Sequence, residues 1–280
     1  MMPRSSNVIS IQSQVVHGHV GNSAAMLPMQ VRGLTVAAVP TTLLSNNPHF
    51  DTMRGRVLDS ELVGDLLRGV EERGLIEASG YIVSGYLGSR ANGDVVAAFV
   101  ERARRRNPDI VYICDPVMGD AHLGVFVADA VVACILEKLV PLADVIMPNQ
   151  FEAGLIGGGP VADWAGLKAA IGKIAARAVV TGCVLEDTPL GLIETVVLDG
   201  ETQTRLAFPR LPIVPVGTGD LLTGIVTANL ADGLSLVEAA RDAAGVLVDV
   251  LGRTVAAGQA EMRLADVIEA FLPRGWEIRA

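Results

Sequence analysis

The sequence predicts an α/β fold with a mainly parallel central sheet flanked by helices on both faces. Short apolar segments with strand character alternate with segments of helical periodicity along almost the whole chain. Glycine and proline fall mostly between these segments, as turn residues should. Repeated strand-helix-strand units build parallel sheets with right-handed crossovers, and ligands bind at the carboxyl ends of such strands. The candidate site is therefore sought at those ends.

The individual elements follow from periodicity and from turn and capping residues. The predicted strands are 8–12, 34–39, 81–84, 110–114, 144–147 and 178–181, followed by two strands within 192–208 that turn at Asp199-Gly200. The predicted helices are 23–32, 60–73, 94–106, 129–139, 163–176, 219–231, 235–251 and 263–271, with a short helix after Asn149. Asn22 is expected to cap the first helix, and residues 40–58 are expected to be irregular.

Length and composition restrict the class of protein. The chain has 280 residues, is 50% hydrophobic and shows no repeat or long linker, which favours a single domain spanning residues 1–280. No apolar stretch of about 18 residues and no signal peptide are apparent, so we expect a soluble protein that does not enter a membrane. A net charge of −9 without a basic stripe argues against a nucleic-acid partner.

The cysteines indicate a reducing compartment. Cys114, Cys134 and Cys183 are odd in number and lack metal-ligand spacing. We therefore interpret them as reduced core thiols and expect a cytoplasmic location.

A glycine-rich corner late in the chain is the first candidate for chemistry. Gly217-Thr218-Gly219-Asp220 precedes an apolar helical run, so backbone N–H groups and the positive end of the helix dipole would face outward together. Glycines there would let a phosphoryl group approach the main chain. Asp220 would then accept the proton of an attacking hydroxyl. A plain helix cap remains the alternative for this short motif alone.

Two acidic residues follow neighbouring predicted strands. Asp115 stands at the end of the strand before Pro116, and Glu152 lies three residues after Asn149 at the start of a short helix. Each also has a structural interpretation, because Asp115 could cap a turn and Asn149 with Glu152 fits a helix-capping arrangement. At adjacent strand ends, however, two carboxylates could hold Mg²⁺ through water.

The first strand leads into a loop that should reach the same edge of the sheet. Ser13 is well placed there to hydrogen-bond a substrate, while His17 and His19 fit loop or capping roles better than a metal site. Tyr86 is near enough to this edge to be considered, although packing is its simpler role. Neither a dinucleotide fingerprint nor a P-loop is present, which excludes those two nucleotide-binding classes.

Taken together, these stretches resemble the pyridoxal kinase family of the ribokinase-like superfamily. The similarity runs from about Val8 to the C-terminal helices. The matching blocks are Ser10-Ile11-Gln12-Ser13, Gly18-His19-Val20-Gly21-Asn22, Ser84-Gly85-Tyr86-Leu87-Gly88-Ser89, Cys114-Asp115-Pro116-Val117-Met118-Gly119, Pro148-Asn149-Gln150-Phe151-Glu152 and Val216-Gly217-Thr218-Gly219-Asp220. Six blocks in the family's order are far more specific than one motif.

The resemblance implies a role for each site residue. Asp220 is the expected catalytic base, and Gly217, Thr218 and Gly219 form the expected anion hole. The expected ATP contacts are Asp115, Phe126, Asn149, Glu152, Thr181 and Gly219, with Asp115 and Glu152 also near Mg²⁺. The expected substrate contacts are Ser13, Val20, His49, Tyr86 and Asp220. The family is typically a homodimer that needs ATP, Mg²⁺ and often a monovalent cation such as K⁺ or Na⁺.

Several positions depart from the family pattern. Pro48 replaces a hydroxyl in the substrate loop Asn46-Asn47-Pro48-His49, and Phe126 stands where tyrosine is common. Gly182 stands where relatives carry lysine or serine, and the segment before the anion hole, Arg210–Pro215, is short. These changes bear on vitamer affinity and leave the phosphoryl-transfer residues in place.

The expected activity is ATP-dependent phosphorylation of the 5′-hydroxymethyl group of pyridoxal, giving pyridoxal 5′-phosphate for vitamin B6 salvage. Pyridoxine and pyridoxamine are further possible substrates. Two alternatives remain open: a hydroxymethylpyrimidine kinase or other small-alcohol kinase of the same fold, and a non-catalytic module that binds pyridoxal. The run from Gly217 to Asp220 argues against the second, because a pure binder has no use for a base beside an anion hole.

Overall fold

A computed structural model of the protein describes residues 7–48, 50–172 and 177–272. Its centre is a nine-stranded sheet with the order β11-β10-β9-β8-β5-β4-β1-β2-β3. A separate small hairpin pairs β6 with β7. The strands are β1 (Asn7–Val15), β2 (Thr35–Leu44), β3 (Gly55–Val57), β4 (Ser79–Ser84), β5 (Val111–Cys114), β6 (Gly119–Asp120), β7 (Gly124–Val125), β8 (Val145–Ile146), β9 (Arg177–Cys183), β10 (Leu192–Asp199) and β11 (Thr202–Pro209).

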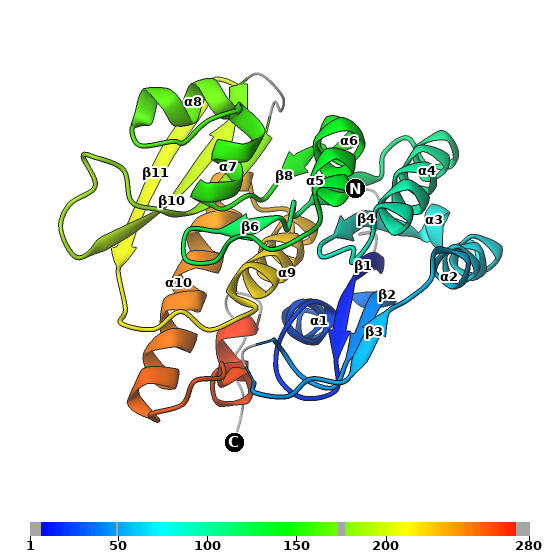
Figure 1. Ribbon diagram of the computed structural model, residues 1–280, viewed down its shortest axis with the longest axis horizontal. Coiled ribbons are helices and arrows are strands. Elements are labelled where there is room, and N and C mark those ends of the chain that lie inside the picture. The colour runs from blue at the N-terminus through cyan, green and yellow to red at the C-terminus, as the bar shows by residue number, and fades with distance from the viewer. Residues whose placement is uncertain (1–6, 49, 173–176, 273–280) are drawn as a thin grey trace.

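The helices cover both faces of this sheet (Figure 1). They are α1 (Asn22–Val31), α2 (Ser60–Glu72), α3 (Leu75–Ala78), α4 (Arg90–Arg106), α5 (Asp129–Cys134), the π-helix η1 (Ile135–Leu139), α6 (Val140–Leu142), α7 (Gln150–Gly157), α8 (Trp164–Gly172), α9 (Thr218–Ala231), α10 (Leu236–Ala256) and the 3₁₀ segment η2 (Leu264–Phe271). One core cluster lies under α1, α9, α10 and η2, and the other lies under α2 to α8. This two-sided arrangement confirms the predicted fold class.

Strand direction explains where a ligand would bind. The six strands from β9 to β2 run parallel, whereas β3, β10 and β11 pair antiparallel at the two sides of the sheet. The chain moves from β1 to β2 on one side of β1 and then crosses to β4 on the other side. Such a reversal leaves a crevice at the carboxyl ends of the strands. Here it lies between the ends of β1 and β4.

Close packing of α1 on α9 brings the N-terminal and C-terminal thirds of the chain together at this crevice. Gly224 of α9 faces Ala25 of α1 so closely that a Cβ on Gly224 would lie 2.5 Å from the Ala25 carbonyl oxygen. Since real Cβ atoms do not approach backbone oxygen so closely, only glycine fits at residue 224. The fold thus positions the start of α9 against the loop between β1 and α1.

Most predicted elements are present, with instructive differences. Residues 40–58 were expected to be irregular, but β2 extends to Leu44 and pairs with β3. Gly21, and not Asn22, occupies the N-cap of α1, because its positive φ of 57° turns the chain into the helix. Helix α4 begins at Arg90, where the Ser89 side chain caps it. The last four residues of the helix predicted over 163–176 lie outside the described residues.

The remaining general expectations can also be compared with the structure. The three cysteines are buried and unbridged, as expected. Within the described residues, no helix is both long and apolar enough to cross a membrane.

Candidate active site

The start of α9 provides a set of outward-facing amides. Gly217 is the N-cap, with a left-handed φ of 85°, and the first intrahelical bond runs from the Leu221 N–H to the Gly217 carbonyl. The N–H groups of Thr218, Gly219 and Asp220 therefore have no hydrogen-bond acceptor within the helix, because the carbonyls four residues earlier lie before its first turn. A Cβ on Gly217 would lie 1.9 Å from the His19 carbonyl oxygen, so glycine is required there. This geometry suits an anion.

Asp220 lies beside these amides and is held by a residue far away in the sequence. Its Oδ2 accepts a hydrogen bond of 2.8 Å from the N–H of Gly21, the N-cap of α1. Burial raises the pKa of the Asp220 carboxyl, and the Gly21 hydrogen bond partly opposes that rise. The residue is nevertheless only half-buried. Asp220 is thus a carboxylate in the first turn of α9 that is held in a fixed orientation and can accept a proton.

Asp115 approaches the same corner from the end of β5. Its Oδ2 accepts a 3.1 Å hydrogen bond from the Thr223 hydroxyl, one turn into α9, and it would lie 3.8 Å from a Cβ on Gly219. Asp115 is only 7% exposed. Burial, then the charges of Glu152 and Asp220, raise its pKa well above the usual range. Asp115 therefore lies beside the glycine corner.

Glu152 faces Asp115 from the start of α7. Its Oε1 accepts from the N–H groups of Met118 (2.8 Å) and Gly119 (3.3 Å), and its Oε2 accepts from Asn149 N–H (2.9 Å). Burial raises the pKa of Glu152 to about 7, while the three backbone hydrogen bonds lower it. Asn149 caps the helix in return, so the two residues form a full capping box. The structural interpretation of this pair is correct, and it does not exclude a role for Glu152 in binding.

The other predicted nucleotide residues surround this carboxylate pair. Thr181 of β9 forms an isolated parallel β-bridge with Asn149, and the Thr181 N–H donates a hydrogen bond of 2.9 Å to the Pro148 carbonyl. Phe126 follows the β6–β7 hairpin, where its N–H donates to the Met118 carbonyl at 3.1 Å and its side chain is exposed. Thr181 therefore lies where β8 and β9 end, and Phe126 lies next to the β6–β7 hairpin.

The predicted substrate residues Ser13 and Tyr86 lie at the carboxyl ends of β1 and β4, and Val20 lies in the loop that follows β1. Ser13 is 4% exposed, and its carbonyl oxygen and hydroxyl face Gly21 so closely that only glycine fits opposite them. Val20 immediately precedes Gly21, and a Cβ on Gly217 would lie 3.2 Å from the Val20 Cα. Tyr86 follows β4, and burial raises the pKa of its hydroxyl. His49 lies outside the described residues.

Sequence reasoning missed two residues that shape this site. The main-chain N–H of Gly21 holds Asp220, and the hydroxyl of Thr223 holds Asp115. The second could have been found, because Thr223 lies three residues after Asp220 and so shares its side of a helix. The first could not, since nothing in the local sequence pairs two residues that are 199 positions apart.

Two buried carboxylates without a basic partner fit a hard cation. Within the described residues no ion pair joins Asp115 or Glu152 to arginine or lysine. Their mutual repulsion would be relieved by a divalent ion or by a proton. No group of three or more potential ligand side chains occurs in the described part of the chain, so a metal here would need ligands from phosphate or water.

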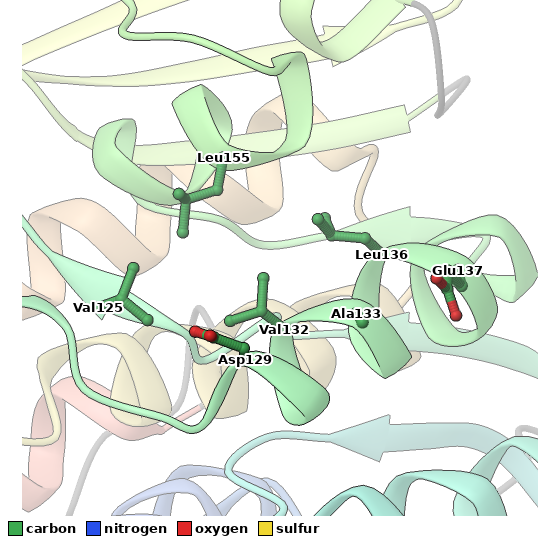
Figure 2. A pocket seen from close by; sticks show the side chains of 7 residues that line it. All are labelled: Val125, Asp129, Val132, Ala133, Leu136, Glu137 and Leu155. Carbon is green, nitrogen blue, oxygen red and sulfur yellow. The ribbon is translucent and has the colours of Figure 1, made fainter.

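A separate hollow of about 560 Å³ lies beyond the hairpin (Figure 2). It is lined mainly by apolar side chains of β7, α5, η1 and α7, including Val125, Val132, Leu136 and Leu155, with Asp129 and Glu137 at its border. None of the predicted site residues lines it. The candidate active site is therefore defined by convergent polar groups and not by this hollow.

Comparison with known proteins shows the family to which the chain belongs. The model of the phosphomethylpyrimidine kinase family matches residues 21–264. The chain is 35% identical to a pyridoxal kinase PdxY of Leifsonia xyli subsp. xyli, covering 94% of this chain and 95% of the relative. It is 36% identical to a pyridoxine/pyridoxal/pyridoxamine kinase of Bordetella avium, covering 95% and 89%.

A solved structure extends the agreement to three dimensions. The pyridoxal kinase of Leishmania donovani in complex with ADP and pyridoxine superposes with a TM-score of 0.86 and 29% identity over 95% of each chain. The resemblance inferred from six sequence blocks is confirmed. The protein accordingly belongs to the phosphomethylpyrimidine kinase family and, within it, to the pyridoxal kinases of the ribokinase-like superfamily.

Proposed function

We propose that the protein is an ATP-dependent kinase that phosphorylates the 5′-hydroxymethyl group of pyridoxal, producing pyridoxal 5′-phosphate in vitamin B6 salvage. The observation that carries the proposal is the position of Asp220, which the Gly21 N–H holds beside the free amides at the start of α9. Relatives of similar length carry the name pyridoxal kinase, which supports the choice of substrate.

In the proposed reaction the alcohol oxygen attacks the γ-phosphorus of ATP, and the bond to the β,γ-bridging oxygen breaks to release ADP. Asp220 orients the alcohol and takes its proton as the new bond forms. The amides of Gly217, Thr218 and Gly219 bind the oxygens of the transferred phosphoryl group, where helix geometry already aims them. Little reorganisation is then needed when charge develops.

The nucleotide would extend from this corner toward the ends of β8 and β9. Asp115, Phe126, Asn149, Glu152, Thr181 and Gly219 are its proposed contacts. Asp115 and Glu152 would hold Mg²⁺, which neutralises phosphate charge when bound. A monovalent cation, K⁺ or Na⁺, is a further proposed requirement. Ser13, Val20, His49 and Tyr86 would contact the pyridoxal ring and its substituents.

We further propose that the chain acts as one kinase domain, forms a homodimer and works in the cytoplasm. The buried, unbridged thiols support a reducing compartment. An exposed apolar surface near β2 and β3 supports self-association.

A second candidate is a hydroxymethylpyrimidine kinase, which the name of the matching family model favours. Both reactions transfer phosphate to a primary alcohol on a heteroaromatic ring, so the same catalytic corner would serve either. Turnover of pyridoxal, pyridoxine, pyridoxamine and the pyrimidine alcohol, measured by ADP release, distinguishes them. Saturable pyridoxal binding without ATP consumption would instead indicate a binding module.

Substitution of Asp220 tests the mechanism. Asp220→Ala should lower kcat by at least ~10²-fold while pyridoxal and ATP still bind, because the variant loses a group that acts mainly in the transition state. Coupled ADP-release kinetics and equilibrium binding measure the two effects separately.

Asp220→Asn is the matched control for folding. The amide oxygen can still accept from the Gly21 N–H, so the melting temperature should stay close to that of the wild type, yet the amide cannot accept a proton. It should therefore be about as slow as the alanine variant. An asparagine variant with wild-type kcat would rule out Asp220 as the base.

A further inference from the structure

One carboxylate outside the predicted site touches two loops that border it. Glu261 lies in the segment between α10 and η2, and its Oε1 accepts a short hydrogen bond from the Asn47 side-chain amide. Its other oxygen faces Gly18, where a Cβ would lie 2.7 Å from Oε2. Gly18 has a positive φ of 96°, so it lacks a side chain where the carboxylate approaches and adopts a conformation that glycine favours. Glu261 thus joins residues that are more than 200 positions away in the sequence.

The first of these loops, residues 16–21, is part of the catalytic corner. At its far end the Gly21 N–H binds Asp220, and the His19 carbonyl packs against Gly217. At its near end the His17 N–H donates to the Ser45 carbonyl at 2.9 Å. Glu261 therefore contacts the middle of a loop whose two ends are already fixed.

The second loop connects β2 with β3 and contains the predicted substrate residue His49. Its base is closed by hydrogen bonds from the Ser45 N–H to the Arg54 carbonyl (2.7 Å) and from the Asn46 side chain to the Thr52 carbonyl (2.9 Å). Asn47 is only 2% exposed, although it lies within a surface loop. Its buried amide is directed to Glu261.

Glu261 is itself held in place by its neighbours. Met262 and Leu264 are 3% and 1% exposed in the core cluster beneath α10. The Arg263 N–H donates to the Thr254 hydroxyl at 3.3 Å, and the Gln259 N–H donates to the Thr254 carbonyl at 3.1 Å. A carboxylate on such an anchored segment can fix a loop, because it does not move with the loop.

We propose that Glu261 is a positioning residue for the alcohol substrate: by binding the buried Asn47 it fixes the β2–β3 loop against the β1–α1 loop, which contains the predicted substrate residue Val20. The proposal rests on the proposed kinase function, because it assigns the loop to the substrate and not to the nucleotide. It predicts an effect on substrate affinity that is separate from the chemical step and from ATP binding.

Steady-state kinetics of Glu261→Ala test the proposal. The KM for pyridoxal should rise about tenfold, the scale of one lost hydrogen bond to a charged group, while kcat and the KM for ATP change by less than about twofold. Glu261→Gln keeps an acceptor oxygen at the same reach and should restore the KM to within about threefold of wild type. A purely structural role would change all kinetic constants and would not distinguish the two variants in this way.

Two controls complete the design. Glu269→Ala removes a carboxylate from the same C-terminal segment, where it pairs with Arg253 at 2.9 Å on the exposed surface, and should leave the KM for pyridoxal unchanged. Asn47→Ala combined with Glu261→Ala should be no worse than either single variant, because both remove the same contact.

Hydrogen exchange of the Ser45 and Arg54 amides provides a readout that needs no catalysis. Glu261→Ala should speed their exchange at least about fivefold, and Glu261→Gln should not. If the wild-type enzyme fails to phosphorylate pyridoxal, the proposed function is wrong, but the exchange data still decide whether Glu261 holds the loop. Unchanged exchange together with an unchanged KM in Glu261→Ala would overturn the inference, as would additive effects in the double variant.

Discussion

Three carboxyl groups without a basic partner in the described structure give the catalytic corner an unusual response to pH. Burial, with the charges of Glu152 and Asp220, raises the pKa of Asp115 well above its usual range. Burial also raises the pKa of Asp220, and it raises that of Glu152 from 4.5 to about 7. A raised pKa means that the folded state keeps a proton which the unfolded chain has already lost. These groups therefore stabilise the protein below the usual carboxyl pKa and lose that stabilisation as the pH rises.

The ligand-free protein should accordingly be more stable near pH 5 than near pH 8. Glu152 alone should lower the free energy of unfolding by up to ~3 kcal/mol as the pH rises from about 4.5 to about 7. Urea unfolding at several pH values measures the slope. Asp115→Asn removes one of the repelling charges and should make the loss of stability with rising pH smaller. Added Mg²⁺ should also reduce this loss near pH 8. A slope equal in wild type and Asp115→Asn would show that this cluster is not its source.

At the residue scale, the sequence predicted side chains that local pattern can locate. Asp115 follows an apolar strand, Glu152 follows a helix cap, and Asp220 follows two glycines, so each has a recognisable neighbourhood. The groups that orient them were not predictable in the same way. The Gly21 amide and Glu261 act across 199 and 214 positions of sequence, and only the fold brings such residues together.

At the scale of elements, the contact between α1 and α9 decides the geometry of the corner. Gly224→Ala would place a Cβ 2.5 Å from the Ala25 carbonyl and 2.8 Å from its Cα, so the helices must separate. We expect the variant to be destabilised by about 1–3 kcal/mol. Because α1 carries the N-cap Gly21 and α9 carries Asp220, kcat should fall as well. Thermal unfolding and steady-state kinetics measure the two effects.

Gly245→Ala is the matched control for that substitution. Gly245 lies inside α10, and nothing stands within 4 Å of the position that its Cβ would take. Alanine there should stabilise the protein by about 0.5–1 kcal/mol, the difference in helix propensity, and leave kcat unchanged. Equal stability changes in the two variants would show that the helix contact does not constrain residue 224.

Helices and strands were predicted correctly where the apolar residues recur with a clear period. Strands were missed where only pairing with another strand orders them. The strands β4, β5, β8 and β9 and the longer helices between them have apolar periods that local sequence reveals. The strand β3 was not predicted, because its three exposed residues show no alternation of buried and exposed positions and are ordered by pairing with β2. The small hairpin of β6 and β7 was also missed. Each of its strands has only two residues, too few to show alternation.

At the scale of the whole molecule, one end of the sheet carries several exposed apolar side chains. Large apolar side chains are exposed on β2, β3, the loop between them and α2, which lie together at one end of the sheet (Figure 1). They are Leu43, Phe50, Met53, Val57, Leu62 and Leu66. An exposed apolar patch beside a short edge strand is typical of an interface between proteins. The expected homodimer would cover this surface.

That interface can be tested by the mass of the protein in solution. Sedimentation velocity should give about twice the chain mass of 29.3 kDa for the wild type. Leu43→Asp combined with Met53→Asp should shift the protein toward the single-chain mass, because charges would have to be buried when the patch is covered. Leu190→Asp changes a fully exposed leucine between β9 and β10, at the opposite side of the sheet, and should leave the mass unchanged. A wild type that sediments as a single chain at every concentration would refute the dimer, whereas dissociation by Leu190→Asp alone would move the interface to the other side of the sheet.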